Sequence, residues 1–340
     1  MFREKLDVPL ALTFDDVLLV PAPSLVEPNE ADIHTRFSRN IPLNIPLVGA
    51  AMDTVTESAM AMALAREGGI GVIHRNMSPE QEIEEVHRVK RAEELIERNV
   101  LSVSPTTSVA DVERLMVEHG IGGVPVLENE KIVGIVSRRD VRAIASRRGS
   151  ESVQAIMTRQ PITAGEDISM EQALETMYTN KVERLPVVDK GGRLLGIITM
   201  QDILEKRQYP NATRDARKRL RVAAAVGPFD ISRAHLLDEC GVDALVVDCA
   251  HGHNLNVVRA IRDIKGSVKA DVVAGNIATR EAAEDLIDTV DGLKVGIGPG
   301  SICTTRIVAG VGVPQVSAIA SVADVTRGTG IPVIADGGIR

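Results

Sequence analysis

The chain has 340 residues and a formal net charge of −8, which argues against a protein that binds DNA through bulk positive charge. Hydrophobic residues make up 44% and charged residues 25%, the balance of a soluble globular protein, and neither a membrane-spanning run nor a signal peptide is evident. Aromatic residues are only 2%, so we expect an aliphatic core, and the three cysteines (Cys240, Cys249, Cys303) form no disulfide framework, which favours a cytoplasmic location.

Short apolar strands that end in small residues recur along the chain. Helical patterns over 58–67, 232–240 and 280–287 separate several of them, and this alternation predicts an α/β fold with a parallel sheet. Seven such strands suggest a (β/α)8 TIM barrel with one strand missing. The predicted strands cover residues 46–52, 69–74, 222–226, 244–248, 271–276, 293–297 and 331–336.

The barrel pattern is interrupted by an internal repeat over 94–206. An apolar pair of strands recurs with a spacing of 62 residues, which separates Gly134 from Gly196 and Asp140 from Asp202. Helical patterns over 109–119 and 170–180 precede the two copies. We therefore predict a first barrel part (1–93), an inserted pair of domains (94–206, dividing into 94–150 and 151–206) and a second barrel part (207–340). The basic linker after residue 206 is expected to be a solvated return helix.

Residues 296–303, of sequence GIGPGSIC, follow a predicted buried strand. Glycines at this spacing let the backbone turn tightly with its amides or carbonyls facing a cavity. Cys303 then lies at the carboxyl end of a strand, where barrel enzymes keep their chemistry. A thiol at such a place acts as a nucleophile if its pKa is lowered, and is otherwise a buried structural cysteine.

The loop and its continuation, 296–315, resemble the active-site loop of inosine-5′-monophosphate (IMP) dehydrogenases. The resemblance extends to 12–19 (LTFDDVLL) and 51–57 (AMDTVTE) and covers essentially the whole chain. It implies an NAD⁺-dependent oxidation of IMP to xanthosine 5′-monophosphate (XMP), the committed step of guanine nucleotide synthesis, in a homotetramer. Cys303 would attack C2 of the purine, hydride would leave for the nicotinamide, and the resulting thioimidate would be hydrolysed.

The same resemblance assigns roles to individual residues. Thr305 would lie near the nicotinamide and the hydrolytic water, and at Ala50 many relatives have a serine that this chain lacks. Backbone carbonyls of Gly298, Gly300 and Cys303 would hold a potassium ion. The implied substrate-binding residues are Met52, Asn276, Ser301, Asp336, Gly337 and Gly338, and the implied cofactor-binding residues are Asp248, Cys249, Ala250, Gly296 and Gly298.

The repeat resembles a tandem pair of CBS domains, inserted where IMP dehydrogenases carry theirs. In that family a hydroxyl–x–x–Asp motif binds adenine nucleotides, here Ser137 with Asp140 and Thr199 with Asp202. The alternative is that each hydroxyl–Asp pair only caps the helix that follows its strand.

Three other interpretations stay open. Cys249, His251 and His253 form a C-x-H-x-H pattern that suits zinc, although no fourth ligand is evident. GMP reductase shares the cysteine loop, but its loop typically continues as TGVGYPQ, whereas residues 309–315 here read AGVGVPQ. A non-catalytic nucleotide sensor would retain the CBS pair without needing the cysteine.

The last residues, Ile339 and Arg340, follow directly on the seventh predicted strand. The resemblance therefore implies that the eighth strand and the mobile flap, with its Arg-Tyr pair that activates water, are absent from this chain. We expect incomplete turnover unless those residues come from elsewhere.

Overall fold

The computed structural model describes residues 9–92, 95–142, 144 and 149–339, without the side chains of 205–207. The chain divides into two compact units, residues 1–92 with 211–340 (unit 1) and residues 93–210 (unit 2). The sequence placed the boundaries at 94 and 206. Residue 94 and the side chains of Lys206 and Arg207 lie outside the described part, as does Arg340.

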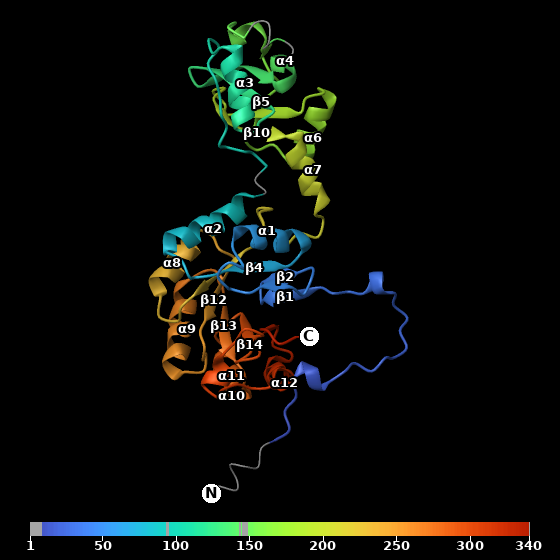
Figure 1. The fold of residues 1–340 in the computed structure, drawn as a ribbon, viewed down its shortest axis with the longest axis vertical. Coiled ribbons are helices and arrows are strands. Elements are labelled where there is room, and N and C mark those ends of the chain that lie inside the picture. Colours follow the sequence, from blue (N-terminus) through green and yellow to red (C-terminus); the bar gives the residue numbers. More distant parts are fainter. Residues whose placement is uncertain (1–8, 93–94, 143, 145–148, 340) are drawn as a thin grey trace. The chain divides into compact units, whose positions relative to one another are not determined.

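Unit 1 is built on one curled sheet of seven strands (Figure 1). Its order is β15-β14-β13-β12-β11-β4-β3, and every neighbouring pair is parallel. The carboxyl ends of all seven strands therefore meet at one edge. The strands are β3 (Val48–Gly49), β4 (Ile70–Ile73), β11 (Ala223–Val226), β12 (Ala244–Asp248), β13 (Asp271–Ile277), β14 (Gly292–Val295) and β15 (Val333–Ala335).

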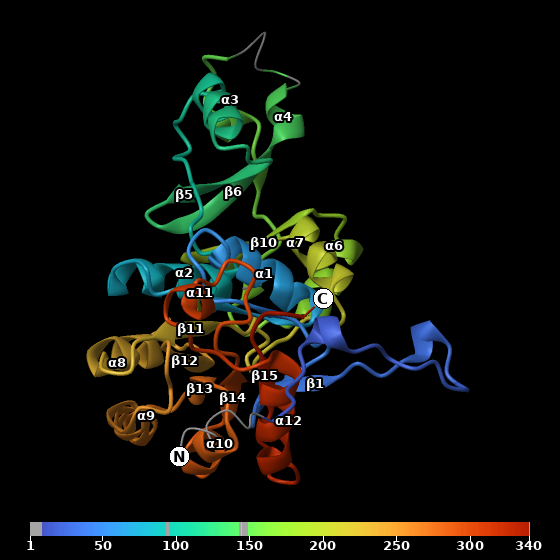
Figure 2. The same cartoon turned by 60° about the horizontal axis from the view of Figure 1, so that its bottom comes forward.

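Helices connect these strands and cover the outside of the sheet (Figure 2). Local signals fix their ends: Ser78 caps α2 through its hydroxyl with Pro79 in the first turn, and Gly68 ends α1 in the left-handed conformation. Within the described residues, every helix is too short or too polar to span a membrane. The helices are α1 (Ser58–Glu67), α2 (Pro79–Arg91), α8 (Ile231–Glu239), α9 (Leu255–Ser267), α10 (Arg280–Leu286), α11 (Thr305–Val308) and α12 (Gln315–Thr326).

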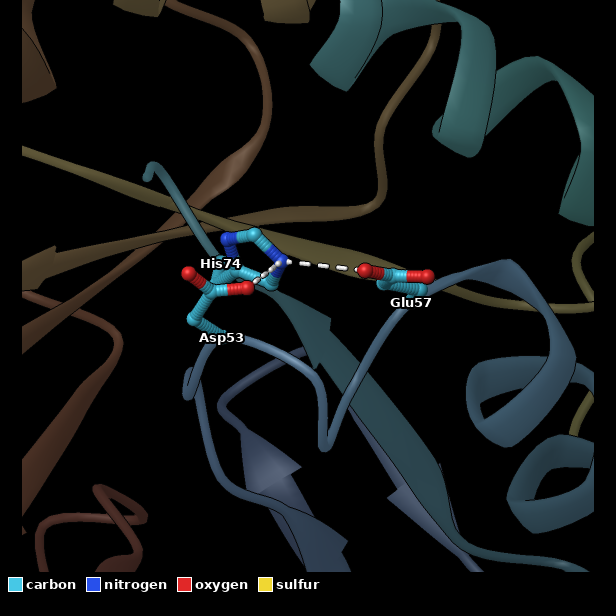
Figure 3. Close-up of side chains that lie close together, drawn as sticks. All are labelled: Asp53, Glu57 and His74. Atoms are coloured by element: carbon cyan, nitrogen blue, oxygen red, sulfur yellow. Dashed lines mark ion pairs between the residues drawn. The ribbon is translucent and has the colours of Figure 1, made fainter. Parts of the chain in front are cut away.

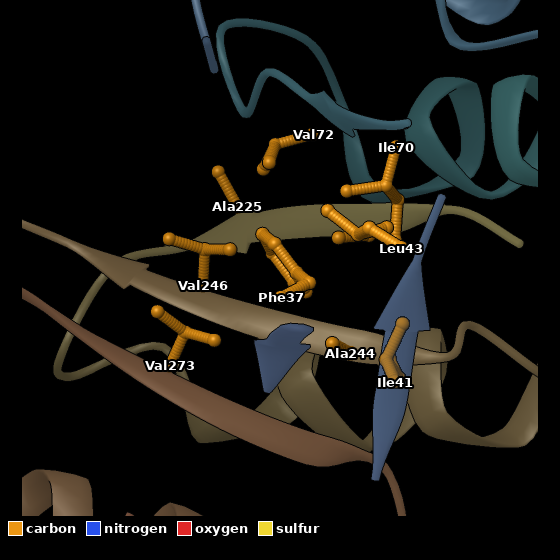
Figure 4. Packing of buried hydrophobic residues seen from close by; sticks show 10 residues of the cluster. Phe37, Ile41, Leu43, Ile70, Val72, Ala225, Ala244, Val246 and Val273 are labelled. Atoms are coloured by element: carbon orange, nitrogen blue, oxygen red, sulfur yellow. The ribbon is translucent and has the colours of Figure 1, made fainter. Parts of the chain in front are cut away.

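A hairpin that the sequence analysis missed closes the amino-terminal end of the sheet. Its strands β1 (Thr35–Ser38) and β2 (Ile41–Leu43) are antiparallel, and Phe37 is buried against sheet residues such as Val246 and Val273 (Figure 4). The hairpin is tied to strand starts, because Asp271 accepts hydrogen bonds from the Ser38 hydroxyl (2.5 Å) and the Asn40 amide (2.8 Å). An apolar plug therefore fills this end of the curled sheet.

Unit 2 contains two copies of a helix–strand–strand–helix arrangement. Each copy has its own apolar core, and reciprocal backbone bonds join them, from Ile132 N to Gly192 O and from Leu194 N to Glu130 O. One sheet has the order β5-β6-β7 and the other β10-β9-β8. The elements are α3 (Val109–Glu118), β5 (Gly123–Glu128), β6 (Lys131–Ser137), α4 (Arg138–Arg142), β7 (Thr158–Arg159), β8 (Ala164–Gly165), α6 (Met170–Thr179), β9 (Arg184–Val188), β10 (Leu194–Thr199) and α7 (Met200–Gln208).

Most predicted elements of unit 1 are confirmed within two or three residues, but two predictions are wrong. The first predicted strand, 46–52, shrinks to the two residues of β3, because residues 51–56 form a turn. The return helix expected after residue 206 stops at Gln208. The chain then makes a tight turn in which Asp215 accepts backbone bonds from Arg217 and Arg219, and this local network replaces helical bonding.

Two shorter helical turns lie in the amino-terminal segment of unit 1, η2 (Phe14–Asp16) and η3 (Pro28–Glu30), and η4 (Val153–Ala155) lies in unit 2. Residues 9–34 are otherwise without regular structure and largely exposed. Leu12 attaches this segment to α12, because its backbone N–H and C=O bond to the Ser317 hydroxyl (2.8 Å) and the Ser317 N–H (3.2 Å).

Candidate active site

Polar side chains gather at the carboxyl ends of neighbouring strands in unit 1. Asn276 lies near the end of β13, and its amide Nδ2 donates to Asp336 Oδ2 (2.7 Å), just after β15, and to Gly296 O (2.6 Å), just after β14. The parallel order of the strands brings these residues, 20 and 60 positions apart, to one place. Three of the predicted ligand-binding residues are therefore in direct contact.

A lysine that the sequence analysis missed connects a fourth predicted ligand-binding residue, Asp248, to this group. Lys294, in β14, places its Nζ 2.9 Å from Asp248 Oδ1 and 2.7 Å from Asp336 Oδ2. Burial opposes its charge, but the two carboxylates outweigh burial and raise its pKa. Burial likewise opposes ionisation of Asp336, yet Lys294 and Asn276 together lower its pKa. The only signal in the sequence was a lysine within an otherwise apolar strand.

The cysteine loop packs directly on the loop after β15. Gly337 and Gly338 have φ values of 77° and 74°, a conformation that disfavours other residues. A Cβ at Gly337 would lie 3.1 Å from Gly300 Cα, and one at Gly338 would lie 2.8 Å from Pro299 Cβ. Only glycines allow this approach to Pro299 and Gly300 of the cysteine loop, which also contains Ser301.

Cys303 lies in a tight turn in which its N–H donates to Gly300 O (3.0 Å). Its Sγ lies 3.2 Å from the hydroxyl oxygen of Thr305, the first residue of α11. Hydrogen bonds from the Thr305 hydroxyl and backbone lower the pKa of Cys303, with a smaller contribution from the Arg306 charge. Burial instead raises the pKa of Cys240 to about 11 and raises that of Cys249. Cys303 is therefore the thiol best prepared to act as a thiolate.

Gln315, which the sequence analysis also missed, supports the carboxyl edge of the sheet. It is fully buried at the start of α12. Its Nε2 donates to Val295 O (2.9 Å) and, more weakly, to Asp336 O (3.4 Å), so it fixes the ends of β14 and β15. Two buried oxygens at this edge, Asn276 Oδ1 and Gln315 Oε1, have no hydrogen-bond partner within the described residues. Such atoms are costly unless a ligand or water satisfies them.

The predicted C-x-H-x-H segment is not assembled as a metal site. Cys249 Sγ donates to Gly275 O (3.3 Å), and His253 Nε2 lies 2.9 Å from Asp285 Oδ2. Among the described residues, Cys249, His251 and His253 do not bring their ligand atoms within 4.8 Å of one another. Ala250 is exposed beside them, in the loop after β12.

A different cluster, Asp53, Glu57 and His74, does bring its ligand atoms that close. His74 follows β4 with a side chain only 4% exposed, and its Nε2 lies 3.6 Å from Asp53 Oδ1 and 3.5 Å from Glu57 Oε1 (Figure 3). However, its Nδ1 accepts the N–H of Asn76 (3.2 Å), so the neutral ring carries its proton on Nε2. A metal ligand needs that nitrogen free, so the cluster is best described as a His74 N–H that faces two carboxylates at 3.5–3.6 Å without a hydrogen bond to either.

This cluster holds the loop that contains Met52. Asp53 also accepts from the side-chain amide of Asn76 (2.6 Å), so the β3–α1 loop is tied to the end of β4. Met52 itself is 39% exposed, and its backbone N–H and C=O bond within its own loop. The predicted pocket residue is thus presented at the carboxyl ends of the strands by polar contacts that the sequence analysis did not foresee.

The two predicted nucleotide motifs of unit 2 both cap helices. The Ser137 hydroxyl donates to Asp140 Oδ2 (2.6 Å), and Asp140 Oδ2 also accepts from Ser137 N (2.9 Å) at the start of α4. Thr199 is the N-cap of α7, where its hydroxyl accepts from Asp202 N (3.2 Å). The capping role is therefore present in both copies.

Comparison with known proteins gives one consistent family. Residues 11–340 match the sequence profile described as "IMP dehydrogenase / GMP reductase domain". The chain is 54% identical over 342 residues to the inosine-5′-monophosphate dehydrogenase of Halobacterium salinarum, and covers 68% of that protein. It is 54% identical over 346 residues to that of Methanocaldococcus jannaschii, covering 69% of it. All of this chain takes part in both alignments.

Solved structures resemble the whole chain as well. A cysteine-to-alanine variant of GMP reductase from Trypanosoma brucei superimposes with a TM-score of 0.88 at 39% identity, covering 100% of this chain and 78% of that one. The GMP reductase of the same organism in complex with guanosine 5′-triphosphate gives a TM-score of 0.87 at 40% identity, covering 100% and 83%.

Proposed function

Because the chain belongs to the IMP dehydrogenase / GMP reductase family, we propose that it is an oxidoreductase that converts IMP to XMP with NAD⁺. The observation that carries the proposal is Cys303, whose thiolate is favoured by Thr305 in a loop packed on Gly337 and Gly338. The high-identity relatives are named IMP dehydrogenases, whereas the GMP reductase structures are about 40% identical.

The residues at the sheet edge suit a purine mononucleotide. Asp336 uses one carboxylate oxygen, Oδ2, for Asn276 and Lys294, which leaves Oδ1 to accept the ribose hydroxyls. The backbone of Gly337 and Gly338 and the hydroxyl of Ser301 would bind the phosphate, because amides in left-handed turns form anion-binding concavities. Met52 and Asn276 would line the base.

The proposed chemistry uses the sulfur twice. The Cys303 thiolate bonds to C2 of IMP, and C2 loses its hydrogen as hydride to the nicotinamide, which leaves a thioimidate. Water then adds to C2 and the C–S bond breaks, so that XMP is released and the thiol is restored. The sum is IMP, NAD⁺ and water giving XMP, NADH and a proton. Thr305 stabilises the thiolate in both its attacking and its leaving role.

The cofactor side is built around Asp248. Its Oδ1 is held by Lys294, and its other oxygen is available for ribose hydroxyls. Cys249, Ala250, Gly296 and Gly298 would border the nicotinamide half, and the unpartnered Asn276 Oδ1 offers an acceptor to an amide or hydroxyl. NAD⁺ supplies the hydride acceptor. These acceptors therefore suit the ribose hydroxyls and the amide of a dinucleotide bound at the strand ends.

A potassium ion on Gly298, Gly300 and Cys303 is a further part of the proposal. Backbone carbonyls are the hard oxygen ligands that such a cation takes, and the φ of 81° at Gly298 turns the loop sharply. Gly300 O already accepts the Cys303 N–H, but a carbonyl has a second lone pair for an ion. The chemistry of these carbonyl oxygens therefore suits a potassium ion.

Unit 2 is proposed to be a CBS pair inserted in a (β/α)8 barrel, with adenine nucleotides at Ser137–Asp140 and Thr199–Asp202. A hollow between α3 and α4, lined by Arg138, Arg142 and Glu113 among others, supports anion binding near the first motif. A nucleotide would have to compete with the Ser137–Asp140 bond at 2.6 Å. A cytoplasmic homotetramer remains a prediction from the family resemblance.

The test is intact-mass spectrometry after the chain is incubated with IMP and NAD⁺, with NADH followed by absorbance. We expect NADH to form, at least one equivalent per chain, and any nucleotide adduct to be absent in Cys303→Ala. Cys240→Ala, at the end of α8 and outside the proposed site, is the matched control and should retain both signals. No NADH and no adduct would overturn the proposal.

A second candidate is favoured by the GMP reductase structures that superimpose on the whole chain. That activity would convert GMP to IMP with release of ammonia and oxidation of a reduced nicotinamide. Assaying GMP with NADPH separates the two, because NADPH consumption in the absence of IMP oxidation would reassign the enzyme.

A further inference from the structure

Lys294 reaches across the sheet between two carboxylates that serve different ligands in the proposed function. Asp248 ends β12 and Asp336 follows β15, while Lys294 lies on β14, so β13 stands between Lys294 and Asp248. The lysine crosses β13 at Gly275, where an added Cβ would lie only 2.6 Å from Lys294 Cβ. A glycine at 275 thus opens the path that the lysine stem takes.

The charges at this point are unequal. One buried ammonium, with a side chain 15% exposed, faces two carboxylates, and no second Lys or Arg forms an ion pair with either of them among the described residues. Asp336 receives the Asn276 amide in addition, whereas Asp248 depends on Lys294 for its ion pair. Removing the ammonium would leave two like charges facing each other without compensation, which would disturb both.

We propose that Lys294 is a positioning residue that orients both sugar-binding carboxylates at once, and so links the substrate and cofactor sites. This inference rests on the proposed function, in which Asp336 binds the ribose of IMP and Asp248 that of NAD⁺. Lys294 already donates to one oxygen of each carboxylate and leaves the other oxygen for the ribose. Its effect on both ligands therefore passes through the two carboxylates.

The proposal predicts that one substitution, at Lys294, weakens the binding of both IMP and NAD⁺. Lys294→Met should weaken IMP and NAD⁺ by about tenfold or more each, the size expected when hydrogen bonds to charged groups are lost. Asp248→Asn should weaken NAD⁺ strongly and change IMP affinity by no more than about twofold, because Asp336 keeps both Lys294 and Asn276. Lys294→Arg, which keeps the charge, should restore both affinities to within a few-fold.

Binding of IMP and of NAD⁺ to each variant would be measured separately by calorimetry, followed by single-turnover hydride transfer at saturating ligands. We expect both apparent dissociation constants to rise in Lys294→Met while the saturated rate changes little. Loss of affinity for only one ligand, or equal losses in Lys294→Met and Lys294→Arg, would overturn the proposal.

Thermal melting curves show whether a loss of binding in a variant is caused by a loss of fold. If Lys294→Met does not fold, Lys294→Gln replaces it, since glutamine keeps a donor without the charge and should show the same two-sided loss. The two proposals fail separately: absence of NADH and of adduct in the unchanged chain removes the reaction, whereas a one-sided effect on binding removes only the role of Lys294.

Discussion

The two ends of the curled sheet in unit 1 both hold buried charge, but they use it differently. At the amino-terminal end, Asp243 accepts from Lys90 Nζ (2.5 Å) and Val222 N (2.8 Å), and Asp291 accepts from Lys265 Nζ (2.5 Å) and Val272 N (2.8 Å). At the carboxyl end, Asn276 Oδ1, Gln315 Oε1 and His74 Nε2 have no hydrogen-bond partner within the described residues.

The difference shows that contacts within the chain satisfy the buried carboxylates at the amino-terminal end but leave buried acceptors unsatisfied at the carboxyl end. An unsatisfied buried polar group costs about 1–3 kcal/mol, so several at one edge reduce the stability of the fold without a ligand. The amino-terminal end avoids most of this cost with the hairpin plug and paired carboxylates, although Thr213 Oγ1, near the start of β11, also has no partner within the described residues. At the carboxyl end, where we propose that nucleotides bind, the acceptors Asn276 Oδ1 and Gln315 Oε1 stay without partners within the described residues. Substitutions at the two ends should therefore separate stability from ligand binding.

The largest expected effect is at the amino-terminal end. Lys90→Met should lower the free energy of unfolding by roughly 3 kcal/mol, because the buried Asp243 loses its ammonium partner and keeps the weaker contact with Arg221 at 3.8 Å. Lys90 is only 4% exposed and also lies 3.3 Å from Asp215 Oδ2. Urea unfolding followed by circular dichroism measures the loss. The folded fraction should still bind IMP with unchanged affinity.

Lys265→Met is the matched control for that substitution. Lys265 makes an equally short contact, 2.5 Å to Asp291, but its side chain is 29% exposed, so water can replace the ammonium. We expect a loss well below that of Lys90→Met. Equal losses from the two variants would show that burial does not set the strength of these pairs, and weakened IMP binding in Lys90→Met would show that the ends are coupled.

The sequence predicted the elements of the sheet better than its closure. Alternating apolar strands and helices specify a parallel α/β sheet, whose strands end at one edge. The family resemblance assigned Asn276 and Asp336 to the substrate and Gly296 to the cofactor, and the parallel order of the strands explains why the three are in contact. The β1–β2 hairpin gave no such signal, because strands of four and three residues are too short to show an alternating pattern. Its burial depends on tertiary contacts with Asp271.

Lys294 and Gln315 were missed for a related reason. A single polar residue in a strand or at a helix start is usually exposed, and only the three-dimensional sheet shows that both face the strand ends. Asp336, by contrast, was named from the family resemblance, and its place at the end of a strand before two glycines is local information that agrees with that role. Sequence reasoning thus found the ends of strands and missed what supports them.

A pair of glycines tests the same contrast with a smaller effect. Gly338, after β15, has φ 74°, and a Cβ there would meet Pro299 at 2.8 Å; Gly330, before β15, has φ 78° and open space around it. Alanine at either position should cost about 1–2 kcal/mol in backbone strain. Only Gly338→Ala should displace the loop that holds Ser301 and weaken IMP binding, by about tenfold.

Thermal melting and IMP titration of the two variants would be compared directly. Similar melting temperatures with different IMP affinities would locate the phosphate-binding role at Gly338. If Gly330→Ala weakened IMP binding as much, the effect would be strain transmitted along β15, and the contrast between the two ends would lose this support.

The smallest expected effect concerns the reactivity of Cys303 at the carboxyl end. Thr305 stabilises the thiolate through its hydroxyl, so Thr305→Val should raise the pKa of Cys303. The thiolate fraction at neutral pH then falls, and the alkylation rate at pH 7 should drop severalfold, whereas at high pH, where the thiol is ionised in both proteins, the rates should converge.

Iodoacetamide labelling across pH, read by peptide mass spectrometry, measures this shift for each cysteine. Cys240 is an internal reference, because burial raises its pKa to about 11 and Thr305→Val should leave its slow labelling unchanged. A rate that fell equally at all pH values would show that the valine blocks access rather than destabilising the thiolate. An unchanged profile would mean that the hydroxyl 3.2 Å from Sγ does not prepare the nucleophile, and that the open end of the sheet binds nucleotide without activating the cysteine through Thr305.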